Sequence, residues 1–219
     1  LIHTTPACRT NESSSMSFYE DKIFPFFMEK ATKTFRREIA ELIAQAEGRV
    51  LEIGAGTGAN LGFYSAAVTE VIGIEPVAAM LEKAQRVVQQ TGHDFPVQLQ
   101  VGDARALPFE DNSFDSVVAC LVFCTIPEPE QAVEEMRRVL KPGGKLVFYE
   151  HVASNRPRVR AWQKRINPLW RKLACGCEIT RDTRCLFENA GFHYQHIKDF
   201  DHPKVPPLMA PIIAGIAVK

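Results

Sequence analysis

The spacing of hydrophobic positions changes along the chain and divides it into regions. Between residues 18 and 46, the residues Phe27, Ala31, Phe35 and Ile39 recur at intervals typical of one face of an amphipathic helix. From residue 49 on, short apolar runs typical of buried strands alternate with amphipathic stretches. The pattern predicts strands at 49–54, 70–75, 97–103, 114–120 and 145–151, and helices at 77–91 and 129–140.

The alternation of strands and helices predicts an α/β fold. Parallel strands need long crossover connections, which helices of this length supply, so we expect a doubly wound sheet covered on both faces. After residue 151 the pattern is interrupted, and it resumes with a helix at 181–190 and strands at 192–199 and 212–218. The last two strands follow each other directly and therefore favour antiparallel pairing. We predict a seven-stranded, mainly parallel sheet with one antiparallel strand near the C-terminus.

The composition indicates a single domain with two additions. Residues 1–15 are polar and without periodicity, which indicates a disordered tail or an addition made for expression. We expect residues 16–219 to form one domain, with a helical lead-in at 16–47 and an inserted basic segment at 154–180. Positive charge is concentrated there, because residues 154–185 contain nine basic and two acidic side chains.

Charge is unevenly spread in a chain whose net charge is zero. Residues 1–150 contain 14 basic and 21 acidic side chains, whereas residues 151–219 contain 12 and 5. The sequence shows neither an apolar run of membrane-spanning length nor a secretory leader, so we expect a cytoplasmic protein. Its six cysteines have no regular spacing, which favours reduced thiols over a disulfide framework.

The strongest local signal is the run LEIGAGTGAN, in which Gly54, Gly56 and Gly58 follow a predicted strand and precede a helix. Glycines at such a turn allow positive φ and let a ligand approach the main chain. The run also fits the dinucleotide-binding pattern G-x-G-x-x-A, with Glu75 about twenty residues further on. A nicotinamide-dependent oxidoreductase and an enzyme that binds S-adenosylmethionine are therefore competing hypotheses.

Three features favour S-adenosylmethionine. Glu52 places a carboxylate near the strand end, which suits a ligand with an ammonium, a sulfonium and no pyrophosphate. Asp103 ends the third strand at the carboxyl edge of the sheet, where a carboxylate can accept a hydrogen bond from the adenine amine. Pro142, Gly143 and Gly144 form a turn before the fifth strand.

These three runs, in this order, resemble the class I S-adenosylmethionine-dependent methyltransferases over residues 16–219. Within that class, further runs resemble the thiol S-methyltransferase group of methyltransferase-like proteins. These runs are LVFCTIPEP (121–129), EHVA (150–153), GCEITRD (176–182), FENAGF (187–192) and GIAVK (215–219).

The resemblance implies a cofactor site at the carboxyl edge of the sheet. Glu52 and residues 54–58 would surround the methionine part of S-adenosylmethionine, and Glu75 would bind the ribose hydroxyls. Asp103 with Ala104 would contact the adenine edge. The full set that the resemblance assigns to the cofactor is Tyr19, Glu52, Gly54, Ala55, Gly56, Thr57, Gly58, Asn60, Glu75, Pro76, Met80, Asp103, Ala104 and Leu121.

Methyl transfer from a sulfonium is an in-line displacement, so aligning the reacting atoms is the main task of the enzyme. A free thiol has a pKa of roughly 8.5, so a few per cent is thiolate at neutral pH and no base is required. If a base is used, the candidate catalytic residue is His151, at the carboxyl end of the fifth strand. The alternative is that His151 is a hydrogen-bonded structural residue. Glu150, beside it in the sequence, either orients His151 or faces the edge of the core.

We expect a small-molecule methyl acceptor, and the resemblance favours a thiol sulfur. Quinone C-methylation and phospholipid N-methylation remain alternatives, because the LKPGG run and the sheet pattern are equally typical of those enzymes. A non-catalytic module that binds the cofactor is a further alternative, since binding motifs do not prove turnover.

The basic segment at 156–174 has apolar residues at near-helical spacing, and Asn167 and Pro168 fit the N-cap and first position of a helix. We expect a lid over the active site, with peripheral contact to an anionic membrane as the alternative. The neutral net charge and the lack of a recognisable module argue against nucleic-acid binding.

The cysteines do not predict a metal site. Cys175, Cys177 and Cys185 with His193 lack the paired C-x-x-C spacing of structural zinc sites. The two cysteines within residues 120–124 flank the expected substrate pocket and are interpreted as small packing residues rather than catalytic thiols. The sequence therefore predicts no metal, and it leaves the oligomeric state open.

Overall fold

The computed structural model describes residues 24–219, and the side chains from Thr34 on. The chain divides into two compact units, Leu1–Phe35 and Arg36–Lys219. In the first unit the structure describes the first part of helix α2 (Phe24–Ile43), which lies inside the range where the sequence predicts a helix. Tyr19, assigned to the cofactor by resemblance, and the tail at 1–15 lie outside the described residues.

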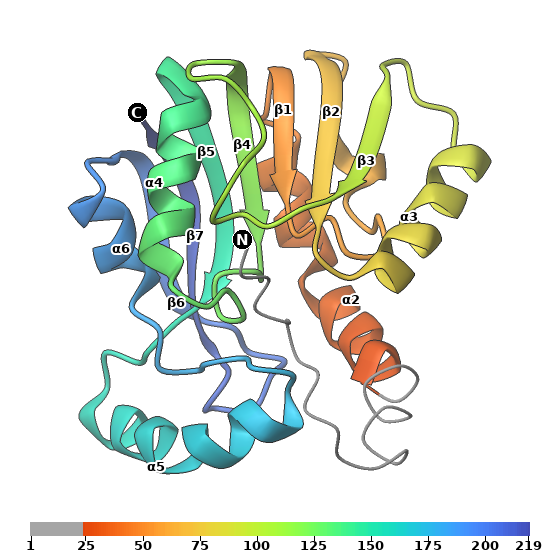
Figure 1. Ribbon diagram of the computed structural model, residues 1–219. Coiled ribbons are helices and arrows are strands. Elements are labelled where there is room, and N and C mark those ends of the chain that lie inside the picture. The colour runs from red at the N-terminus through yellow and green to blue at the C-terminus, as the bar shows by residue number, and fades with distance from the viewer. Residues whose placement is uncertain (1–23) are drawn as a thin grey trace, which may run out of the picture. The chain divides into compact units, whose positions relative to one another are not determined.

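The second unit contains alternating strands and helices, as the hydrophobic pattern predicts (Figure 1). Its central strands are almost wholly buried, which is typical of strands covered on both faces. The elements are β1 (Gly48–Ile53), the short 3-10 helix η2 (Leu61–Phe63), β2 (Val68–Glu75), α3 (Ala78–Gln90), β3 (Val97–Val101), β4 (Phe114–Cys120), α4 (Pro129–Val139), β5 (Leu140–His151), α5 (Pro157–Leu173), α6 (Thr183–Asn189), β6 (His193–Asp201) and β7 (Pro211–Val218).

The strands form one seven-stranded sheet in the order β3-β2-β1-β4-β5-β7-β6. Strands β1 to β5 pair in parallel, so their carboxyl ends lie at one edge. Strand β7 pairs antiparallel with both β5 and β6. Because residues 202–210 form only turns between β6 and β7, the two strands can pair only in antiparallel fashion. The predicted fold, with one antiparallel strand near the C-terminus, is confirmed.

Strand β7 lies between two partners, and a glycine at its centre allows the close approach. Gly215 pairs with Phe148 of β5 and with Ile197 of β6. A Cβ atom at Gly215 would collide with the backbone carbonyl of His196. The lack of a side chain is therefore required here for packing.

The turn predicted at Pro142–Gly144 lies within β5 rather than before it. Leu140 pairs with Phe114 and Lys145 with Ser116, so residues 141–144 lie opposite a single residue of β4. The middle glycine of the turn has a φ of 76°, in the left-handed region. The turn is thus a bulge in a longer strand, which proline and glycine signal in the same way as a strand boundary.

Helix α5 is continuous, and the helix start predicted at Asn167 and Pro168 is wrong. Pro168 lies inside α5, and Asn167 Oδ1 accepts a hydrogen bond from Ile179 N–H at 3.0 Å instead of capping the helix. The upstream turns are held by Gln163, which is buried and hydrogen-bonded to three backbone groups outside the helix. These tertiary contacts outweigh the loss of the one backbone donor that proline lacks.

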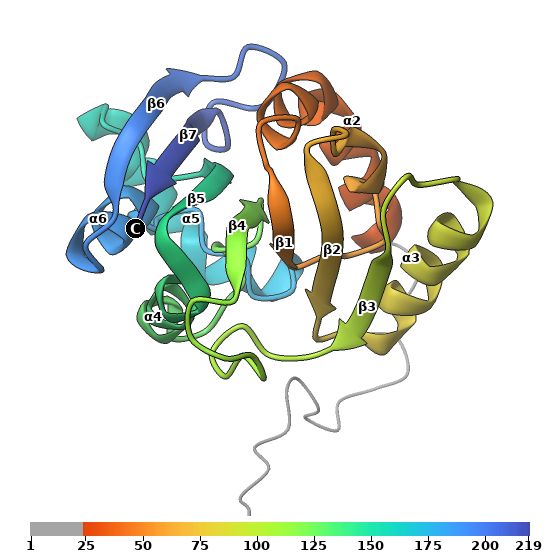
Figure 2. The same cartoon turned by 90° about the horizontal axis from the view of Figure 1, so that it is seen from above.

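Helix α5 lies across the carboxyl edge: it is below the ends of β4 and β5 in Figure 1 and behind these two strands in Figure 2, which is viewed from above. Helix α4 packs on β5 and against α6. Phe187 of α6 contacts Phe123 and Phe148 edge to face. Its ring centroid lies 5.1 Å from that of Phe123 and 5.2 Å from that of Phe148. Across residues 24–219, the structure contains no helix of the length and apolar character needed to cross a bilayer.

Candidate active site

The turn after β1 is tight at its first glycine and open at its second. Gly54 and Gly56 have φ of 69° and 55°, values that favour glycine. A Cβ atom at Gly54 would lie 2.5 Å from Val122 Cγ2, so the turn packs closely against the segment after β4. At Gly56 the nearest atom to an added Cβ would be the Gly54 carbonyl oxygen, at 3.8 Å. A ligand can therefore approach the main chain at Gly56.

Glu75, the last residue of β2, holds the glycine turn in place. Its Oε2 accepts a hydrogen bond from Gly56 N–H and its Oε1 accepts one from Val77 N–H, each at 3.0 Å. Burial raises the pKa of this carboxyl above its ordinary value, although both hydrogen bonds oppose the change. Each oxygen keeps a second lone pair, so Glu75 can still accept hydrogen bonds from a ligand.

Glu52 is a fully enclosed carboxylate under the glycine turn. It is 1% exposed, and it accepts hydrogen bonds from Asn60 Nδ2 at 2.8 Å and Tyr64 OH at 3.0 Å. Burial raises the pKa of Glu52 from 4.5 to about 7, and the two hydrogen bonds lower it only in part. Asn60, assigned to the cofactor by resemblance, therefore contacts Glu52 directly.

Asp103 lies at the carboxyl edge after β3 and is paired with an arginine. The Arg105 guanidinium donates to both carboxylate oxygens, at distances of 2.6 to 3.0 Å, and also donates to Glu128 at 2.9 Å. This contact holds the pKa of Asp103 below its usual value. About half of the Asp103 side chain is exposed, so its remaining lone pairs face solvent.

The segment after β4 is shaped by a buried acid from β5. Glu150 Oε1 accepts hydrogen bonds from Val122 N–H at 2.9 Å and Phe123 N–H at 3.2 Å. Leu121, just before them, has a φ of 56°, which is uncommon for a residue with a side chain. Burial raises the pKa of Glu150 to about 7. Glu150 thus fixes the segment after β4, a role that the sequence did not indicate.

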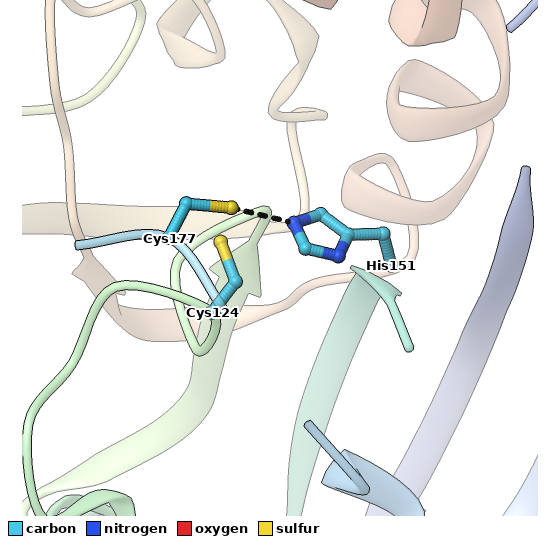
Figure 3. Close-up of side chains that lie close together, drawn as sticks. All are labelled: Cys124, His151 and Cys177. Carbon is cyan, nitrogen blue, oxygen red and sulfur yellow. Dashed lines mark hydrogen bonds between the residues drawn. The ribbon is translucent and has the colours of Figure 1, made fainter. Parts of the chain in front are cut away.

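His151 is buried beside two cysteines (Figure 3). Its Nε2 lies 3.3 Å from Cys177 Sγ, and the sulfur of Cys124 lies beside this pair. The Cys124 thiol and the imidazole lower the pKa of Cys177, although burial opposes them, and the same contact raises the pKa of Cys124. Burial lowers the pKa of His151, but the Cys177 sulfur and the Glu150 carboxylate outweigh it and raise the pKa.

The structure places the other described cofactor candidates around the same edge. Gly58 packs against α3, where an added Cβ would lie 3.1 Å from Ala84 Cα. The remaining candidates differ in exposure: Ala55 and Ala104 are buried, Thr57 and Met80 are half-buried, and Pro76 is exposed.

Sequence reasoning missed the grouping of His151 with Cys124 and Cys177. It considered Cys175 and Cys185 as partners of Cys177, but both are exposed. The one available signal was position, since Cys124 follows closely on the carboxyl end of β4 and His151 is the last residue of β5.

The sheet reverses its strand order between β1 and β4, and ligands of such sheets bind beyond the carboxyl ends of the strands at that point. Together with the glycine turn, this arrangement is typical of α/β enzymes that bind a nucleoside cofactor. Residues 51–148 match the model of a methyltransferase domain family. The chain is also 34% identical over 216 residues to a thiol S-methyltransferase of Homo sapiens, which covers 90% of this chain and 86% of the relative.

The chain belongs to the class I S-adenosylmethionine-dependent methyltransferase family, and it is an S-adenosylmethionine-dependent methyltransferase. It is 37% identical over 153 residues to a phosphatidylethanolamine N-methyltransferase of Cereibacter sphaeroides, covering 70% of this chain and 75% of the relative. A solved structure from Bacillus halodurans, titled as a methyltransferase, shares the fold with a TM-score of 0.65 and 23% identity, covering 75% of this chain and 71% of that one. The competing nicotinamide hypothesis is set aside.

Proposed function

We propose that the methyl acceptor of this enzyme is a small thiol. The supporting observation is the extent of similarity to the human thiol S-methyltransferase, which covers 90% of the chain. Such a match includes most of the residues after 148, where the methyltransferase domain match ends. Those residues supply His151, Cys177 and α5. The phosphatidylethanolamine relative covers 70% of the chain, so methylation of a phospholipid amine is the second candidate.

We propose that S-adenosylmethionine, which supplies the methyl group as a sulfonium, binds along the edge from the glycine turn to Asp103. Glu75 presents a free lone pair on each oxygen for the ribose hydroxyls, because its main-chain partners use only one. Asp103, oriented by Arg105, presents its outer lone pairs to the adenine amine. Leu121 lines the site from the segment that Glu150 fixes.

The residues at this edge fit a cationic ligand. Glu52 is charged at neutral pH only in part, because burial raises its pKa to about 7. A positive charge brought close to it favours the ionised form. The ammonium of the methionine part of the cofactor is such a charge, so Glu52 supports the assignment of this end of the site.

The chain contributes to the transfer mainly by alignment and by excluding water. His151 was the candidate base, but its Nε2 is engaged by Cys177, and this contact would have to open before His151 could take a proton from the acceptor. A thiol acceptor does not need that step, since about a few per cent of a free thiol is already ionised at neutral pH.

The outer face of α5 suits an anionic membrane surface, and we propose that it contacts one. Trp162, Leu169 and Leu173 are each more than half exposed. The helix also contains six basic side chains and no acidic one. Apolar side chains on a basic helix favour the interface of an anionic bilayer, from which lipophilic acceptors can be taken up.

A mass-spectrometric acceptor screen tests the proposal. The full chain is incubated with S-adenosylmethionine and, in separate reactions, an alkyl thiol, phosphatidylethanolamine or a demethylated quinol. We expect a gain of one methyl group on the thiol, with S-adenosylhomocysteine formed in equal amount, and loss of both products in Glu75→Ala. Methylation of the amine or the quinol, with no methylated thiol, would overturn the assignment.

A further inference from the structure

Three side chains that commonly bind metal ions meet at the carboxyl edge of the sheet. Cys124 lies in the segment after β4, His151 ends β5, and Cys177 follows α5 (Figure 3). Their ligand atoms, two sulfurs and one imidazole nitrogen, all lie within 4.8 Å of one another. All three residues are buried. The figure shows the Cys177 sulfur directed toward the imidazole ring and the Cys124 sulfur directed toward the Cys177 sulfur.

Backbone hydrogen bonds fix this arrangement. Glu178 N–H donates to the Cys124 carbonyl oxygen at 2.8 Å, which joins the segment after α5 to the segment after β4. Cys177 N–H donates to the Ala174 carbonyl oxygen at 2.9 Å and ties the same segment to the end of α5. Ligands held in this way need little rearrangement to bind an ion, which favours affinity.

The ligand types and their spacing suit zinc. Two cysteines and one histidine form one of the ligand sets of catalytic zinc sites, which keep a fourth position open. Zn–S bonds of about 2.3 Å and Zn–N bonds of about 2.0 Å at tetrahedral angles imply a sulfur–nitrogen separation of about 3.5 Å. Cys177 Sγ and His151 Nε2 are 3.3 Å apart, so a small outward movement would complete that geometry.

We propose that Cys124 Sγ, Cys177 Sγ and His151 Nε2 bind one Zn²⁺ ion, whose fourth position binds the acceptor sulfur. The second part rests on the proposed thiol acceptor. The cysteines bind as thiolates, so their thiol protons pass to solvent when the ion binds.

The acceptor thiol also loses its proton to solvent on binding to the ion. Its sulfur forms the new bond to the methyl carbon, while the bond from that carbon to the donor sulfonium breaks and leaves its electron pair on the donor sulfur. The neutral thioether product is a weaker ligand than a thiolate and leaves the ion. These steps require no protein base, because the acceptor proton passes to solvent. His151 then acts as a ligand of the ion rather than as a base.

Cobalt titration of the metal-depleted full chain tests the site. Thiolate-bound Co²⁺ absorbs strongly in the near ultraviolet, and we expect this absorption to saturate at one ion per chain and to disappear when Zn²⁺ is added. Cys124→Ser and Cys177→Ser should each weaken binding by more than about 100-fold, since loss of an outer-shell partner alone costs about 10–100-fold. The matched control is Cys185→Ser, which removes an exposed cysteine and should bind as the wild type does.

The outcomes separate the two proposals. Unchanged cobalt absorption in both Cys124→Ser and Cys177→Ser, with circular dichroism showing folded proteins, would overturn the metal site. A Cys124–Cys177 disulfide in freshly purified protein that takes up no metal after reduction would do the same. Equal thiol methylation by the zinc-loaded and zinc-free enzyme would overturn the role of the ion in catalysis, whereas metal binding without any thiol methylation would overturn the proposed acceptor alone.

Discussion

Glu52 is a buried carboxylate, and its replacement by glutamine tests the electrostatics of the cofactor edge. Glutamine keeps the shape of the side chain and its acceptor for Asn60 Nδ2, which lies 2.8 Å away in the wild type. Tyr64 OH would have to rotate so that it accepts from the new amide instead of donating to an oxygen. The substitution therefore removes one titrating group and leaves most of the packing in place.

The size of the effect follows from the pKa of Glu52. Burial raises it from 4.5 in the unfolded chain to about 7 in the folded protein. Between these pH values the folded state binds more protons than the unfolded state, so the free energy of unfolding falls as pH rises. At about 1.4 kcal/mol per unit, the wild type loses about 2–3 kcal/mol between pH 5 and pH 8 through this group. Glu52→Gln does not titrate and escapes this loss.

Urea unfolding at pH 5 and pH 8 measures the difference. At pH 5 we expect Glu52→Gln to be slightly less stable than the wild type, because the altered Tyr64 contact costs about 1 kcal/mol. At pH 8 we expect it to be more stable by about 2 kcal/mol, once that loss is subtracted from the relieved burial penalty. The control is Glu110→Gln, an exposed position where the difference should stay within about 0.5 kcal/mol at both pH values.

Cofactor affinity should move in the opposite direction. If Glu52 faces the ammonium of S-adenosylhomocysteine, loss of its charge should weaken calorimetric binding by at least about tenfold at pH 8, since hydrogen bonds to charged groups contribute about 1.5–3 kcal/mol. A variant that has the same stability difference from the wild type at both pH values would refute the electrostatic reasoning. Unchanged affinity would remove Glu52 from the cofactor site.

Two further predictions concern the sheet and α5. Gly215→Ala should lower the free energy of unfolding in urea by about 2–3 kcal/mol, because the added methyl group meets the His196 carbonyl. The control is Gly92→Ala, where an added Cβ has open space, and it should lower the free energy of unfolding by less than about 1 kcal/mol. Equal losses would contradict the close-approach argument. The full chain should sediment with phosphatidylserine vesicles and not with neutral ones. The double variant Trp162→Gln, Leu169→Gln should lower the bound fraction severalfold, because both side chains are exposed on α5. Equal bound fractions for the double variant and the wild type would exclude α5 as the contact.

The fold was predictable because the signals that specify it are local and repeated. The strand predicted at Phe114–Cys120 has those bounds in the structure, since a short run of β-branched and apolar residues is typical of a strand buried on both faces. The antiparallel β7 followed from the missing helix before it. Pro168 misled the prediction because its helix is held by Gln163 and Asn167, whose partners lie outside α5.

The site was predictable only where its residues are close in sequence or match a known motif. The glycine turn and Glu75 form one unit, joined by the hydrogen bond from Gly56 N–H. Cys124, His151 and Cys177 come from three separate segments, and their separations of 26 or 27 residues match no metal-binding spacing. The parallel register of β4 and β5 brings Cys124 and His151 to one edge, and the hydrogen bond from Glu178 N–H to the Cys124 carbonyl oxygen brings Cys177 beside them.

The uneven charge along the chain has a physical consequence for stability and function. Glu52 and Glu150 are acids of the first 150 residues that are buried at the cofactor edge, where their raised pKa values show that the charged forms are disfavoured. The basic residues of α5, by contrast, lie on an exposed helix and need little desolvation. Glu150 uses its carboxylate to hold the segment after β4, whereas Glu52 is favourable where a ligand uses its charge. Substitutions that stabilise the protein by removing the charge of Glu52 should therefore weaken cofactor binding, whereas substitutions of the exposed basic residues of α5 should leave the free energy of unfolding nearly unchanged.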